Sequence, residues 1–146
     1  MTSAGAGGGA DPPAQHEGAD PTDGVDPRIA TGSVYRPPEV EGRRVLVMRR
    51  WPRGVAKTRV QEWFRELGPS DGLLDQYQQG AGTIDWPAFE AAYLEEVGQQ
   101  GALLDQIAQL ATAGAVVLLC GSHWPCHRLP LARHVSARLE GLDNLR

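Results

Sequence analysis

The sequence predicts a small three-layer α/β domain, in which a short and mostly parallel sheet is flanked by helices. Two short apolar runs, 45–48 and 116–119, are nearly continuous, which is typical of strands covered on both faces. The segment 53–115 between them shows mainly helical periodicity. Because parallel neighbouring strands require a long and usually helical crossover, this order of patterns predicts an α/β fold.

Three strands are expected in the sheet. Residues 29–35 are expected to form a short strand. Glycine and small side chains give this segment only a weak strand pattern, so the strand is expected at the edge of the sheet. Residues 44–49 predict the central strand, and the run that begins at Val116 predicts its partner. The Trp51-Pro-Arg-Gly54 sequence predicts irregular backbone, because proline restricts the residue before it and glycine permits unusual dihedral angles.

Helices are expected in the crossover and at the end of the chain. The first covers 57–67, because its apolar residues recur at i, i+3, i+4 and i+7. These apolar residues are Val60, Trp63, Phe64 and Leu67. Ser70 predicts the N-cap of a short second helix. Further helices are expected over 86–97, 102–113 and 130–139, where apolar residues again follow helical spacing.

The first 28 residues predict a disordered tail, which leaves a single α/β domain over 29–146. The tail is rich in Gly, Ala, Pro and Asp, so it cannot bury enough apolar surface to offset the entropy of ordering. Two cysteines are too few for a secreted disulfide scaffold. No apolar run approaches the ~20 residues of a membrane helix, and no signal peptide is recognisable. We expect a cytoplasmic protein with reduced thiols, monomeric or weakly dimeric, without a membrane partner.

Charge is distributed unevenly along the chain. The net charge of −4 argues against a general nucleic-acid binder. Eight of the 14 Lys and Arg residues nevertheless lie within 43–65, whereas 66–127 holds eight carboxylates and neither Lys nor Arg. One side of the fold is therefore expected to be basic and to attract an anionic partner such as a phosphate, a nucleotide or a carboxylate.

Polar clusters follow both apolar runs and form the candidate site. Because parallel neighbours end at the same sheet edge, where open α/β folds bind ligands, the two clusters are expected to meet. The expected ligand-binding residues are Arg49, Trp51, Arg53 and Arg128, with Trp124 as a second aromatic wall. The candidate catalytic residues are Cys120, Cys126 and His127.

Three functions remain open for this site. The first is binding of an anionic small molecule, because guanidinium groups fit phosphate and carboxylate, and the same positive surroundings would lower the pKa of a cysteine. Such binding could be combined with catalysis by a cysteine, with His127 or His123 as the general base. The spacing from Cys120 to Arg128 is two residues longer than in the Cys-x5-Arg loop of phosphatases. The second is zinc binding through Cys120, His123, Cys126 and His127, at a spacing unlike common fingers. The third is a non-catalytic interaction module, and a redox pair of the two cysteines is a further alternative. No cofactor is expected.

Several motifs resemble the YeaO-like family, a bacterial family of domains of unknown function. They are Arg44-Val-Leu-Val-Met-Arg-Arg-Trp-Pro-Arg-Gly-Val55, Lys57, Gly68-Pro-Ser70 and Trp86-x-x-Phe89-x-x-x-Tyr93. The resemblance covers about 29–139, and the Cys120 to Arg128 ending is similar to that of a longer branch of the family. It implies the fold and the place of the site but no reaction. The family usually has Asp where this chain has Met48, so a possible acid–base group or metal ligand is missing here.

Overall fold

The computed structural model describes residues 21–37, 40–78, 81–121 and 126–145 of the chain. Their strands form one parallel sheet in the order β1-β4-β2-β3. The strands are β1 (Ile29–Ser33), β2 (Arg43–Leu46), β3 (Glu62–Trp63) and β4 (Val116–Cys120). The α-helices are α1 (Asp71–Tyr77), α2 (Trp86–Gly98), α3 (Gly101–Ala113) and α4 (Arg128–Asn144). The predicted α/β class with its parallel sheet and edge strand β1 is confirmed.

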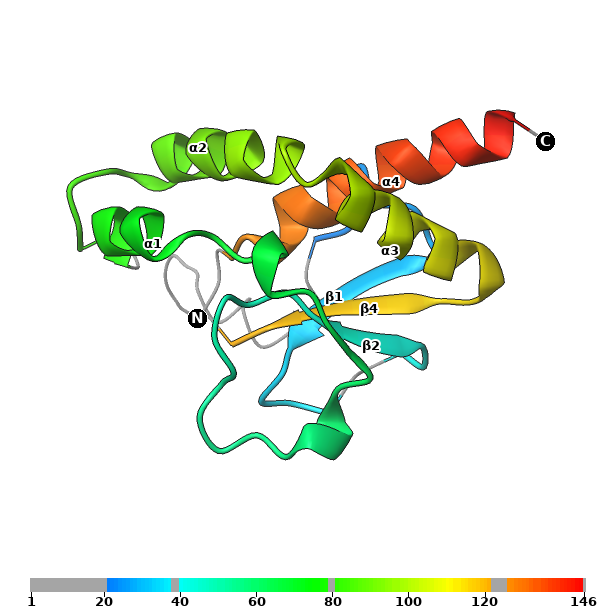
Figure 1. Cartoon of the computed structure of the whole chain (residues 1–146), viewed down its shortest axis with the longest axis horizontal. Coiled ribbons are helices and arrows are strands. Elements are labelled where there is room, and N and C mark those ends of the chain that lie inside the picture. The colour runs from blue at the N-terminus through cyan, green and yellow to red at the C-terminus, as the bar shows by residue number, and fades with distance from the viewer. Residues whose placement is uncertain (1–20, 38–39, 79–80, 122–125, 146) are drawn as a thin grey trace, which may run out of the picture.

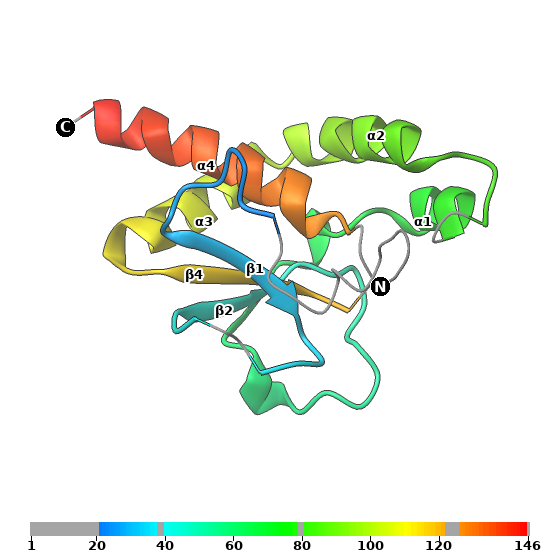
Figure 2. The ribbon, with the colours of Figure 1, turned by 180° about the vertical axis from the view of Figure 1, so that it is seen from behind.

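The sheet separates two apolar cores. Alternate side chains point to opposite faces of a strand, so Val45 and Leu118 face the helices while Leu46 and Leu119 face away from them. All four α-helices lie over the first face (Figure 1). Among the described residues, the second face is covered by mostly irregular backbone that follows β2, with one short 3-10 turn, and not by an α-helix. The same arrangement is visible from behind (Figure 2).

The predicted helix over 57–67 is wrong. This segment instead forms a short 3-10 turn at Lys57–Arg59, the strand β3, and a second 3-10 turn at Arg65–Leu67. Its apolar residues serve both cores: Val60 and Trp63 pack on the second face, whereas Phe64 and Leu67 pack on the helix face. An extended segment that crosses the sheet edge can reach both faces, whereas one face of a helix cannot.

The predicted N-cap at Ser70 is confirmed. The Ser70 side chain accepts a hydrogen bond from the backbone N–H of Leu73 at 3.2 Å, and Asp85 caps α2 through the N–H of Ala88 at 3.1 Å. Helix α4 begins earlier and ends later than the predicted 130–139. None of the helices in the described ranges is long and apolar enough to cross a membrane.

Residues 21–28, which the sequence assigns to the tail, lie against α4. The backbone N–H of Asp26 donates to Ser136 Oγ at 2.8 Å, and Arg133 Nε donates to the carbonyl of Asp23 at 2.8 Å. Val25 packs against the helix-face core. The remainder of the predicted tail, 1–20, lies outside the described residues.

Tyr93 fixes α2 to the segment that leaves the sheet. Its hydroxyl donates to the carbonyl of Leu67 at 2.6 Å, and the side chain is fully buried. Burial raises the pKa of this phenol well above its usual value, so the hydroxyl keeps its proton. The loss of this donor would leave the Leu67 carbonyl buried without its partner.

We expect Tyr93→Phe to lower the free energy of unfolding by about 1–3 kcal/mol, the range for an unsatisfied buried polar group. Tyr77→Phe is the matched control, because Tyr77 is also buried but its hydroxyl has no hydrogen bond among the described residues. Denaturant unfolding of both variants measures the difference. Equal losses would show that the Tyr93 hydroxyl contributes nothing beyond packing.

Candidate functional site

The two segments that were expected to meet leave the sheet at the same edge. Strands β2 and β4 are parallel neighbours, with Leu46 opposite Leu119. The N–H of Val47 donates to the Leu119 carbonyl at 3.0 Å, which continues the pairing by one residue. The Val47 carbonyl in turn lies 2.6 Å from His127 Nε2. The end of β2 is thereby joined to the start of α4.

Four of the predicted site residues form a buried group at this edge, which we call the cysteine cluster. Cys120, Cys126, His127 and Arg128 are only 0%, 2%, 4% and 5% exposed. Arg128 Nη1 donates to Cys120 Sγ at 3.2 Å, and Cys126 Sγ lies 3.5 Å from His127 Nδ1. The cysteines are joined in a disulfide, which differs from the expected reduced thiols. The strand end and the helix start bring the two sulfur atoms together.

His127 is held neutral with its proton on Nε2. A carbonyl oxygen only accepts, so the contact with Val47 requires a proton on Nε2 and leaves the Nδ1 lone pair facing Cys126. Burial lowers the pKa of His127 to about 4, and the positive charge of Arg128 adds to this. The hydrogen bond to Val47 acts in the opposite direction. The edge of the imidazole also packs against Tyr93, with ring centroids 5.2 Å apart.

The other predicted ligand-binding residues do not join this cluster. Arg49 Nη2 donates to the carbonyl of Gly68 at 2.9 Å. Trp51 packs edge-on against Trp63 in the second core, with centroids 5.3 Å apart. Arg53 is exposed in a turn and has no hydrogen bond or ion pair with any described residue. The predicted wall Trp124 and the predicted zinc ligand His123 lie outside the described residues.

Met48 lies beside the residue that follows β4. A Cβ placed on Gly121 would lie 3.3 Å from Met48 Cε and 2.9 Å from Tyr35 Cε2, so the side chains of Met48 and Tyr35 cover this backbone closely. Met48 packs against the second core, on the face of the sheet opposite the helices, so the Asp that the family resemblance implies at this position would lie on that face. In this chain the position is apolar, and the cluster includes no carboxylate among the described residues.

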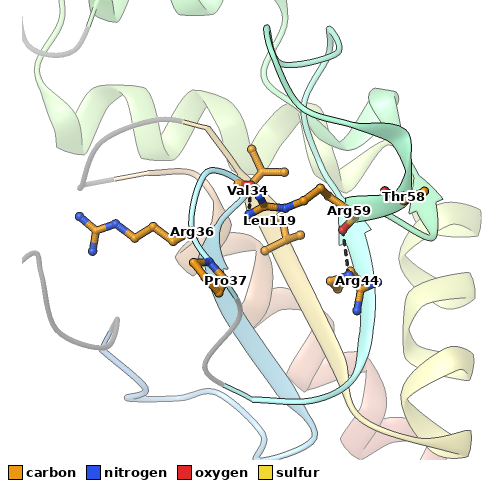
Figure 3. A pocket seen from close by; sticks show the side chains of 7 residues that line it. All are labelled: Val34, Arg36, Pro37, Arg44, Thr58, Arg59 and Leu119. Atoms are coloured by element: carbon orange, nitrogen blue, oxygen red, sulfur yellow. Dashed lines mark hydrogen bonds between the residues drawn. The ribbon is translucent and has the colours of Figure 1, made fainter.

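A second candidate site lies on the opposite face of the sheet, and the sequence analysis missed it. A pocket of about 270 Å³ opens there, and we call it the arginine pocket (Figure 3). Its lining residues are Val34, Arg36, Pro37, Arg44, Thr58, Arg59 and Leu119. They come from four separate segments, three of which the strand order β1-β4-β2 brings together.

Two of the pocket arginines are fixed by backbone carbonyls. Arg44 Nε donates to the carbonyl of Arg59 at 2.8 Å, and Arg59 Nη2 donates to that of Val34 at 3.0 Å. The remaining N–H groups of both guanidiniums have no partner in the described ranges. Arg36 extends away from the other two arginines in Figure 3. The excess of basic residues in 43–65 indicated a basic face. It did not indicate which of these arginines lie together in a pocket.

Comparison with known proteins places the chain among proteins without an assigned activity. The family model described as "Inactive DUF488-N3 subclade" matches residues 28–140. The uncharacterized protein YeaO of Escherichia coli (strain K12) is 35% identical over 89 residues, which cover 59% of this chain and 76% of YeaO. The uncharacterized protein Rv3073c of Mycobacterium tuberculosis (strain ATCC 25618 / H37Rv) is 33% identical over 81 residues, which cover 53% of this chain and 67% of that protein. No solved structure matches the chain.

The buried imidazole predicts a dependence of stability on pH. The pKa of His127 is about 4 in the folded protein and returns to about 6.5 on unfolding, so the unfolded chain binds more protons below pH ~6.5. This contribution to stability is therefore lost as the pH falls from ~6.5 towards ~4. We expect the free energy of unfolding of the disulfide-bonded protein to fall by about 2 kcal/mol between pH ~7 and pH ~5.

Denaturant unfolding at these two pH values measures the effect. His127→Gln removes the titrating group while its amide can still donate to Val47, so this variant should lose most of the dependence. His134→Gln, on a partly exposed position of α4, should retain it. A wild type and a His127→Gln variant with the same pH dependence would contradict the assignment.

Proposed function

This chain belongs to the inactive DUF488-N3 subclade, and we propose that it is a non-catalytic domain that binds a small phosphate-bearing anion in the arginine pocket. The observation that carries this proposal is the composition of the pocket wall. Among the described residues that line the pocket there are three arginines and no carboxylate. Guanidinium groups present planar, paired donors that match the oxygen atoms of phosphate.

Pre-ordering of the pocket supports binding. Because the carbonyls of Arg59 and Val34 already fix the guanidiniums of Arg44 and Arg59, little side-chain entropy is lost when an anion arrives. Thr58 adds a hydroxyl donor, and Leu119 and Pro37 add apolar surface. The volume of about 270 Å³ is close to the lower limit of ~300 Å³ for small-molecule pockets. A phosphate with a small organic group suits this size.

The distribution of charge also favours an anion on this face. The basic segment 43–65 supplies β2, β3 and the irregular cover of the second face, whereas the carboxylates of 66–127 belong mainly to α1, α2 and α3 on the other face (Figure 1). An anion is therefore attracted to the open face even though the whole chain is negative.

Three observations favour binding without turnover. The matching family model is described as inactive. The part of the pocket wall that the structure describes includes no His, Cys, Asp or Glu that could act as a nucleophile or a general base near neutral pH. The cysteines and His127 are buried in a separate cluster and do not line the pocket.

Calorimetric titration with inorganic phosphate, pyrophosphate and a nucleoside diphosphate at low salt tests the proposal. We expect at least one of these anions to bind with one-to-one stoichiometry. Arg44→Gln and Arg59→Gln should each weaken binding by about 10- to 100-fold, because each removes charged hydrogen bonds worth ~1.5–3 kcal/mol. Circular dichroism and thermal unfolding verify that both variants remain folded.

Arg53→Gln is the matched control, because it removes the same charge from an exposed turn of the same basic segment. It should leave the dissociation constant nearly unchanged. If Arg53→Gln weakened anion binding equally, the loss of affinity would reflect the overall positive charge of the segment and not a specific site. Absence of binding by wild type to all three anions would refute the proposed function. Loss of binding in Arg128→Gln but not in Arg44→Gln would favour the site at the carboxyl ends of the strands.

A further inference from the structure

The cysteine cluster has the composition and geometry of a metal site, independent of the arginine pocket. Cys120 Sγ, Cys126 Sγ and one ring nitrogen of His127 all lie within 4.8 Å of one another, and all three residues are buried. The Cys126 Sγ to His127 Nδ1 distance is 3.5 Å. Two such ligands on one tetrahedral zinc ion would be about 3.5 Å apart, given Zn–S and Zn–N bonds of about 2.3 and 2.0–2.1 Å.

A second observation, the orientation of the imidazole, also points to a cation. The hydrogen bond from Nε2 to the Val47 carbonyl leaves Nδ1 as the unprotonated nitrogen and directs its lone pair towards Cys126. A metal-bound histidine usually donates its other ring N–H to a carbonyl or carboxylate, which fixes the tautomer and the ring orientation. The backbone of β2 therefore already holds His127 in the form that a metal requires.

Arg128 places a positive charge beside Cys120. Its Nη1 donates to Cys120 Sγ at 3.2 Å. A guanidinium carries only donors and so cannot itself coordinate a cation. Arg128 is thus not a ligand.

We propose that the reduced protein binds one Zn²⁺ ion through Cys120 Sγ, Cys126 Sγ and His127 Nδ1, and that disulfide formation excludes the ion. Thiolate and imidazole ligands suit zinc, and three protein ligands leave a fourth position for water or another ligand. This set differs from the zinc site expected from the sequence, because it does not depend on His123.

The zinc-bound form and the disulfide form interconvert by the exchange of two electrons. A dithiol reductant gives two electrons and two protons to the Cys120–Cys126 disulfide and becomes a disulfide itself. The protein then holds two thiols, and coordination of Zn²⁺ releases both thiol protons to solvent. In reverse, a disulfide oxidant accepts two electrons from the two thiolates, the S–S bond forms again, and the ion leaves.

Zinc titration of the full chain in competition with a chromophoric chelator tests this inference. Protein reduced with a water-soluble phosphine, and freed of metal, should bind one equivalent of Zn²⁺. Protein that retains its disulfide should bind none at this site. This comparison needs no substitution, so it remains decisive even if a cysteine variant fails to fold.

Variants then assign the ligands in the reduced state. Cys126→Ser and His127→Gln should each weaken zinc binding by at least about 10- to 100-fold, the loss typical even for residues that only support ligands. His134→Gln, which removes a partly exposed histidine outside the cluster, should bind as wild type does. With Co²⁺ as a probe, the wild type should show thiolate-to-metal absorption that Cys126→Ser reduces.

Three outcomes would overturn the inference: no zinc bound by the reduced wild type, equal binding by the disulfide form, or unchanged binding by folded Cys126→Ser. None of them bears on the arginine pocket, because neither cysteine nor His127 lines it. Failure of the metal site and failure of anion binding can therefore be distinguished.

Discussion

The hydrogen bond between His127 and the Val47 carbonyl is the contact on which the arrangement of this edge depends. It joins the residue that follows β2 to the residue before α4, across 80 positions of sequence. Because β2 and β4 are parallel neighbours, their ends lie together, and this bond fixes the start of α4 against the end of β2. The same bond selects the tautomer of His127 and directs Nδ1 towards the sulfur atoms. Burial then keeps the ring neutral.

The sheet also separates two kinds of chemistry. The cysteine cluster lies at the edge beneath the helices, where the disulfide, the imidazole and the guanidinium are buried in contact with one another. The arginine pocket lies on the other face, where irregular backbone replaces a helical layer and leaves room for a ligand. Leu119 lines this pocket, and the next residue, Cys120, belongs to the cluster. Adjacent positions of one strand therefore serve sites on different sides of the sheet, which follows from the alternation of side chains in β structure.

The sequence predicted those features that depend on local patterns. Continuous apolar runs identified the parallel strands, and Ser70 marked a helix start because a capping side chain bonds to backbone only three residues away. Strand pairing was also expected to bring Arg49 and Arg53 to Cys126, but Arg49 bonds to the Gly68 carbonyl and Arg53 is exposed in a turn. The cysteine cluster instead gathers residues that lie close together in the sequence. The helix over 57–67 was mispredicted because a spacing of apolar residues does not reveal that two of them face one core and two the other. The arginine pocket was missed for a related reason, since it depends on the strand order and on carbonyls that orient the side chains.

The central claim is that an anion binds between Arg44 and Arg59, and the side-chain N–H signals of arginine in nuclear magnetic resonance spectra test it most directly. During titration with phosphate or a nucleoside diphosphate, the account predicts saturable shifts of the Arg44 and Arg59 signals at a common dissociation constant, with the Arg53 signal unmoved. Saturable shifts confined to Arg128 and the backbone amides of 126–128, with Arg44 and Arg59 unaffected, would contradict it.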